Sequence, residues 1–136
     1  MIDLVTELHT ENTFVLKRCN IEREYNFNIV RKEVLMLQKY ASPYIAKLID
    51  HDTAKRGRNE ALLLLEYYPG GHLLDRLNGR GGKYLPVESV YKIFGQILLA
   101  LRPMHESSPP LIHRDLKLEN VLFGPVRHYT THHSPY

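Results

Sequence analysis

The first part of the chain consists of short segments that are rich in apolar side chains. Residues 2–8 and 13–18 are rich in apolar side chains, and the polar segment 9–12 separates them. A polar cluster of this kind favours a turn, so the two segments are predicted to form antiparallel strands. Residues 45–52 and 61–68 have the same apolar character and predict two further strands.

Two helices are predicted from the spacing and from helix-breaking residues. Residues 26–40 place apolar side chains three and four positions apart, which indicates one face of a helix: Phe27, Val30, Val34 and Leu37. Ser42 and Pro43 are expected to end this helix. After the break at residues 69–71, Pro-Gly-Gly, a short helix is predicted through Leu77.

The clearest helix follows a glycine-rich loop at residues 78–83. Its apolar stripe consists of Val90, Phe94, Ile97, Leu98 and Leu101. Pro86 suits its first turn, and Pro103 is expected to bend the helix or stop it early. Residues 107–110 predict a loop. Strands that precede helices along the chain indicate an α+β fold, with a small lobe that carries the sheet and a helical lobe.

Composition excludes several other classes of protein. The chain has 136 residues, of which 43% are hydrophobic, and this is enough for one modest domain with a core. Its formal charge of +3 is too small to predict binding of nucleic acid, and the polar segment 53–60 is read as a solvated hairpin loop. A single cysteine, Cys19, favours a reducing compartment. The longest strongly apolar run, residues 61–65, predicts no transmembrane segment, and the first residues do not form a secretory signal, so a cytoplasmic location is expected.

One motif carries chemistry. Residues 113–120 read His-Arg-Asp-Leu-Lys-Leu-Glu-Asn, between the long predicted helix and the short apolar run 121–123. This octet resembles the catalytic loop of protein kinases in its expected setting, and the lysine two residues after the aspartate is the pattern of serine/threonine kinases. The resemblance implies an incomplete protein kinase-like fold. It would contain part of the N-lobe sheet with helix C, the hinge, the first helices of the C-lobe and the catalytic loop.

The kinase resemblance assigns roles to the polar residues of this loop. Asp115 would accept or orient the proton of the substrate hydroxyl, and Lys117 would neutralise the phosphoryl group in transfer. Asn120 would offer an oxygen ligand to Mg²⁺, a hard cation that prefers oxygen. His113 would hold the loop, and Arg114 would meet a phosphorylated activation segment. ATP and Mg²⁺ are the cofactors implied.

The same resemblance predicts residues that bind ATP in the first half of the chain. Lys17, in the segment Phe14-Val-Leu-Lys-Arg18, would be the lysine that contacts the α- and β-phosphates, and Glu33 on the first helix would orient it. Leu65 would be the gatekeeper behind the adenine. Backbone groups of Glu66 and Tyr68, in the hinge, would bind the adenine edge.

A finer resemblance is to the Numb-associated kinase family, which includes the adaptor-associated and cyclin-G-associated kinases. It rests on residues 15–18, Val-Leu-Lys-Arg, on the Gly-Gly pair after the hinge, and on Pro-Pro-Leu-Ile before the catalytic loop. It implies protein substrates that include clathrin adaptor subunits, and a place at endocytic membranes. The implied domain is residues 1–124: the N-lobe at about 1–65, the hinge at 66–70 and a partial C-lobe at 71–124.

Two kinase motifs have no counterpart in the 136 residues. The first glycine is Gly57, so no glycine-rich phosphate loop precedes Lys17, and the last aspartate is Asp115, so no Asp-Phe-Gly follows the catalytic loop. The chain as written is therefore expected not to transfer phosphate at a useful rate. Apolar side chains of the helical lobe are expected to be exposed: Leu98, Leu101 and Leu116.

Two alternatives stay open at this point. The chain could be a fragment of an active serine/threonine kinase, or a catalytically inactive truncated isoform that acts as an interaction module. The histidine-containing tail, residues 125–136, has no standard zinc spacing and is predicted to be a divergent, disordered segment.

Overall fold

The elements of the chain fall into two compact units. The computed structural model describes residues 1–54 and 59–124, so the segment 53–60 is described only in part and the tail lies outside the described residues. Among the described residues, the first unit consists of Met1–Tyr67 and Leu85–Asp115, and the second of Tyr68–Tyr84 and residues 116–124. No helix among the described residues combines the length and the apolar character needed to cross a membrane.

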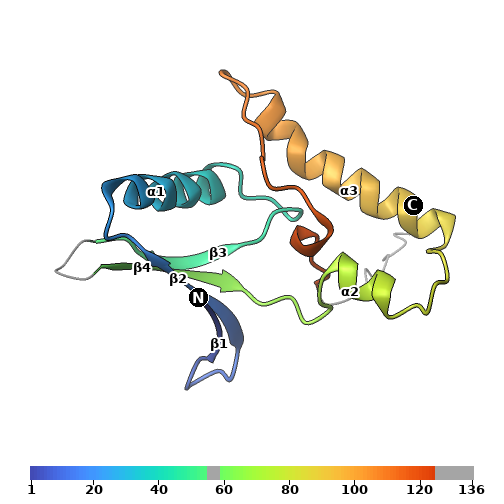
Figure 1. Cartoon of the computed structure of the whole chain (residues 1–136), viewed down its shortest axis with the longest axis horizontal. Coiled ribbons are helices and arrows are strands. Elements are labelled where there is room, and N and C mark those ends of the chain that lie inside the picture. The colour runs from blue at the N-terminus through green and yellow to red at the C-terminus, as the bar shows by residue number, and fades with distance from the viewer. Residues whose placement is uncertain (55–58, 125–136) are drawn as a thin grey trace, which may run out of the picture. The chain divides into compact units, whose positions relative to one another are not determined.

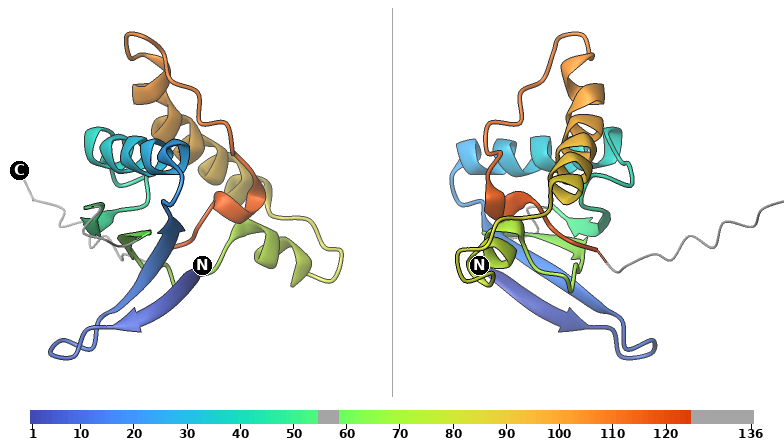
Figure 2. Two further views of the ribbon diagram at one scale, coloured as in Figure 1. Left: turned by 60° about the vertical axis from the view of Figure 1, so that its left-hand side comes forward. Right: turned by 90° about the vertical axis from the view of Figure 1, so that its right-hand side faces the viewer.

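A four-stranded antiparallel sheet organises the first unit (Figure 1, Figure 2). Its strands lie in the order β1-β2-β4-β3. They are β1 (Ile2–Thr6), β2 (Thr13–Asn20), β3 (Leu48–Asp52) and β4 (Glu60–Glu66). The four predicted strands are confirmed, but their ends differ: β1 ends at Thr6 rather than at residue 8, β2 continues to Asn20, and β4 ends at Glu66 rather than at residue 68. The largest difference is that β3 begins at Leu48 rather than at Ile45. The Ile45 amide instead donates to the Ser42 carbonyl at 3.2 Å, in a turn that delays the strand.

The core of the first unit lies between the sheet and α1 (Glu24–Lys39), which covers one sheet face (Figure 1). Its buried members come from both layers and from the segment between them: Ile21, Val30, Val34, Ala61 and Leu63. Two of these, Val30 and Val34, belong to the apolar stripe predicted for this helix. Lys39 in the last turn suits the negative end of the helix dipole.

The long helix α3 (Val87–His105) begins after Pro86, as predicted. The expectation that Pro103 stops it early is wrong, because the helix continues to His105. Proline removes one helical hydrogen bond, and its ring crowds the carbonyl four residues earlier, but in the last turn of α3 these losses do not end the helix. Much of the apolar stripe is exposed: Phe94 is 57% accessible and Leu98 51%. Leu116 is also 51% accessible, whereas Leu101 is half-buried.

The second unit is held together by backbone pairing around two short helices, α2 (Leu73–Asn78) and the 3₁₀ helix η1 (Leu118–Asn120). The Gly70 amide donates to the Phe123 carbonyl at 3.0 Å, and the Phe123 amide donates to the Gly71 carbonyl at 2.9 Å. His72 begins α2, because its Nδ1 accepts the Asp75 amide at 3.1 Å.

Replacing Leu63 with alanine tests the core directly. Leu63 is 0% exposed, whereas its neighbour Leu64 is half-buried on the opposite sheet face. We expect Leu63→Ala to lower the free energy of unfolding by about 3 kcal/mol, because it removes buried methyl groups and leaves a cavity. Leu64→Ala is the matched control and should cost about 1 kcal/mol. Urea unfolding measures both, and equal losses would contradict this description of the core.

Candidate active site

An ion pair joins β2 to α1. The Nζ atom of Lys17 lies 2.7 Å from Oε1 and 2.9 Å from Oε2 of Glu33, so the ammonium group contacts both carboxylate oxygens. The contact predicted between these two residues is therefore present. Each side chain remains 34% exposed. A partly solvated pair contributes at most about 1 kcal/mol to stability, so its main consequence is that it fixes the position of the ammonium group.

Cys19 lies two residues beyond Lys17 on the same strand and senses both charges. Burial raises the pKa of the Cys19 thiol above its ordinary value. The positive charge of Lys17 lowers that pKa and the negative charge of Glu33 raises it, each by less than burial does. The thiol is therefore a chemical reporter of the ion pair, and it is the only cysteine in the sequence.

This reporter gives a prediction that needs no catalytic activity. Glu33→Gln removes an anion and should lower the pKa of Cys19, and Lys17→Met removes a cation and should raise it. Below the pKa, alkylation by iodoacetamide should thus be faster in Glu33→Gln and slower in Lys17→Met, because the thiolate is the nucleophile. Rates measured across pH give the pKa of each variant. Shifts of the same sign in both variants would contradict the arrangement.

Residues 113–115 of the predicted catalytic loop are the last residues of the first unit. Arg114 has φ +65°, a left-handed conformation that is uncommon for a residue other than glycine. Beside it, the Asp115 amide donates to His113 Nδ1 at 3.3 Å. His113 thus contacts the backbone of the loop, in keeping with the structural role expected for it. Asp115 itself is exposed to solvent.

The remainder of the loop belongs to the second unit and forms η1. The Asn120 amide donates to the Lys117 carbonyl at 3.0 Å, which closes a single helical turn. Lys117 and Asn120 are both exposed. The structure therefore brings these two residues into one turn, and it brings Lys17 and Glu33 into one ion pair within the other unit.

The residues predicted to meet adenine lie at and after the end of β4. Leu65 pairs with Val15 on β2 and with Leu48 on β3. The Glu66 amide donates to the Lys47 carbonyl at 2.9 Å, and the Tyr68 carbonyl accepts the Gly71 amide at 3.3 Å. The backbone contacts to adenine stay a prediction.

Sequence reasoning missed the close contact between Gly70 and Phe123. A Cβ atom on Gly70 would lie 2.5 Å from the Phe123 carbonyl oxygen, so only glycine allows this approach. The guanidinium carbon of Arg76 lies 3.6 Å from the centre of the Phe123 ring and covers it. The Gly-Gly pair was the available signal, but it was read as a break in the pattern and as part of the family resemblance, not as a close contact with Phe123.

Within residues 1–54 and 59–124, no group of three or more His, Cys, Asp or Glu side chains is arranged to hold a metal ion. The histidines of the tail lie outside these ranges. The role of Asn120 as an Mg²⁺ ligand stays a prediction.

Comparison with known proteins places these features in a class. The family model for the protein kinase domain matches residues 2–129. A probable serine/threonine-protein kinase of Dictyostelium discoideum is 35% identical over 124 residues, which are 88% of this chain and 11% of the relative. The serine/threonine-protein kinase ppk30 of Schizosaccharomyces pombe is 35% identical over 126 residues, 90% of this chain and 13% of the relative.

A further relative has a name that points to a cellular process. Actin-regulating kinase 1 of Saccharomyces cerevisiae is 34% identical over 119 residues, which are 84% of this chain and 19% of the relative. The chain thus spans less than a fifth of the length of these three relatives. The sheet with its single covering helix is the partial N-lobe of a kinase fold, and the class is α+β as predicted. This chain belongs to the protein kinase domain family.

Proposed function

We propose that Lys17, Glu33 and the octet 113–120 belong to a serine/threonine protein kinase, in which they hold the phosphates of ATP and activate the substrate hydroxyl. The observation that carries the proposal is the Lys17–Glu33 contact at 2.7 Å. It joins a strand to a helix in a chain whose relatives are serine/threonine kinases, and the chain also carries the octet 113–120. The proposed domain comprises an N-lobe at about residues 1–65, a hinge at 66–70 and a C-lobe portion at 71–124.

Lys17 is the proposed phosphate ligand. Glu33 binds the ammonium group through both carboxylate oxygens and leaves it a third N–H donor, because an ammonium group carries three. Such a fixed cation suits the α- and β-phosphates of ATP and needs no reorganisation when the nucleotide arrives. Leu65 would border the adenine ring, and backbone groups of Glu66 and Tyr68 would bind its edge.

Asp115 is the proposed catalytic residue that orients the hydroxyl of a serine or threonine and accepts its proton. Lys117 would neutralise charge on the phosphoryl group as the oxygen–phosphorus bond to the leaving nucleotide breaks. The amide oxygen of Asn120 is a donor of the type Mg²⁺ prefers. When bound, the ion would neutralise phosphate charge. These roles rest on the match to the protein kinase family and on the positions of the three residues in the octet.

The finer assignment is a kinase of the Numb-associated family that phosphorylates clathrin adaptor subunits at endocytic membranes. Its support is the resemblance of residues 15–18 and of the Pro-Pro-Leu-Ile segment before the catalytic loop. A clathrin adaptor subunit should then be a better substrate than casein for the purified protein. Equal rates on the two would leave the kinase proposal in place and remove this finer one.

The general proposal is tested by phosphate transfer. The protein that carries these residues, purified as its cells produce it, is incubated with γ-³²P-ATP, Mg²⁺ and a protein substrate, and the labelled amino acids are identified. Phosphoserine or phosphothreonine is the expected product. Nucleotide binding without any transfer would favour the alternative of an inactive interaction module, and phosphotyrosine alone would contradict the assignment to serine and threonine.

A further inference from the structure

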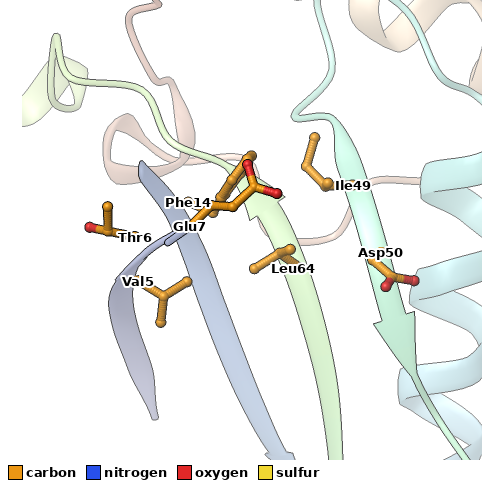
Figure 3. Close-up of a pocket in the computed structure, with 7 residues that line it drawn as sticks. All are labelled: Val5, Thr6, Glu7, Phe14, Ile49, Asp50 and Leu64. Atoms are coloured by element: carbon orange, nitrogen blue, oxygen red, sulfur yellow. The ribbon is translucent and has the colours of Figure 1, made fainter. Parts of the chain in front are cut away.

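A groove of about 400 Å³ lies on the sheet of the first unit (Figure 3). Its apolar lining comes from four strands: Val5 on β1, Phe14 on β2, Ile49 on β3 and Leu64 on β4. Glu7 and Asp50 add two carboxylates to the lining. The volume falls within the range of roughly 300 to 1,000 Å³ that is usual for ligand sites.

The register of the sheet shows which face carries the groove. Val5 pairs with Phe14, and Leu64 pairs with Asp50. Side chains alternate between faces along a strand, and Leu63, next to Leu64, lies in the core against α1. The groove therefore lies on the face turned away from α1 and from the Lys17–Glu33 pair.

An irregularity in β3 exposes an extra apolar side chain here. The register with β4 shifts between Leu48 and Asp50, so that Ile49 is an additional residue in the strand. A bulge of this kind re-aims side chains. Ile49 is 38% exposed and lines the groove together with Asp50, the residue that follows it. The bulge thus places an apolar and an acidic group side by side.

The charge of the groove is opposite to that of the chain. Among the described residues that line it, two are acidic and none is basic, whereas the whole chain carries a formal charge of +3. The Asp50 carboxylate accepts the His51 amide at 2.7 Å, and the Glu7 carboxylate accepts the Thr10 hydroxyl. Each contact uses one oxygen of its carboxylate, and a carboxylate has acceptor sites for several donors.

We propose that this groove docks a peptide segment of a partner protein in which a bulky apolar side chain lies next to lysine or arginine. The apolar side chain would cover Phe14, Ile49 and Leu64, where burial of apolar area is favourable. The neighbouring cations would meet Glu7 and Asp50, and opposite charge selects against acidic segments. Because this face is turned away from the Lys17–Glu33 pair, the segment would bind without contacting that pair, and the inference does not depend on the proposed function.

Fluorescence anisotropy of the full chain with labelled peptides tests the docking. The probe is the capped peptide Lys-Leu-Arg-Phe-Lys-Gly, and the matched control probe is Glu-Leu-Glu-Phe-Glu-Gly. We expect saturable binding of the first alone. Ile49→Ser should weaken it about tenfold through lost apolar contact, and Glu7→Gln and Asp50→Asn about threefold each through lost charge. Glu88→Gln, on α3 and outside the groove, removes the same charge and should leave the affinity unchanged.

Two results would overturn the proposal. One is that the basic peptide does not bind, or binds equally to the wild type and to the three groove variants while circular dichroism shows that all are folded. The other is that sedimentation shows self-association which Ile49→Ser abolishes. In that case a second copy of this chain, rather than a peptide of a partner, would occupy the groove.

Discussion

In the protein that carries these residues, purified as its cells produce it, Asp115→Asn is expected to lower the rate of phosphate transfer to a protein serine by roughly 10²- to 10⁴-fold, the usual contribution of a positioned general base. Asparagine keeps the size of the side chain but does not accept the proton. Because Asp115 is proposed to act on the hydroxyl and not on the nucleotide, the fall should appear in kcat while the KM for ATP stays nearly constant. Steady-state assays with γ-³²P-ATP separate the two constants.

The control for this result is Glu88→Gln, which removes one exposed carboxylate from α3. It should leave kcat and KM unchanged, so that a general effect of net charge is excluded. An Asp115→Asn enzyme that retains more than half of the wild-type kcat would contradict the role assigned to this residue.

Lys17→Met is expected to affect the nucleotide instead. It removes the ammonium group that Glu33 holds at 2.7 Å, and the loss of one fixed electrostatic contact to a reacting group costs roughly 10²- to 10³-fold in rate. Unlike Asp115→Asn, this change should also raise the KM for ATP, because the phosphates lose a contact in the ground state. Assays at several ATP concentrations measure both effects.

Two further variants test this prediction, one with an intermediate expected effect and one as a control. Glu33→Gln keeps Lys17 but loosens its position, so its rate should fall between those of the wild type and Lys17→Met. Lys92→Met removes an exposed lysine of α3 and should have no effect. If Lys92→Met and Lys17→Met lowered the rate equally, the ion pair would have no special part in nucleotide use.

The sequence predicted most of the fold because its patterns are strong. The stripe of α1 contains Val30 and Val34, which the core buries, so periodicity alone located that helix. Local patterns failed where a turn or a tolerated proline decides the boundary. Ile45 looks like part of a strand, but Ser42 closes a turn there through its carbonyl and its hydroxyl. Pro103 stands inside α3 without ending it.

The candidate site was predicted from the resemblance to protein kinases, because the spacing of apolar residues does not show which polar residues come together. Lys17 and Glu33 lie on different elements, and their contact depends on how α1 is placed on the sheet. The bulge at Ile49 could not be predicted, since it arises from the pairing of β3 with β4 and leaves no mark in composition. The contact of Gly70 with Phe123 likewise joins two segments that are distant in the sequence.

The central claim is that Lys17 contacts the phosphates of ATP, and an acyl-phosphate derivative of ATP tests it most directly. This reagent transfers its acyl group to a lysine held beside the bound phosphates, and mass spectrometry then locates the modified residue. We predict acylation of Lys17, suppressed by an excess of ATP. Acylation spread equally over exposed lysines such as Lys39 and Lys92, with no protection by ATP, would contradict the account.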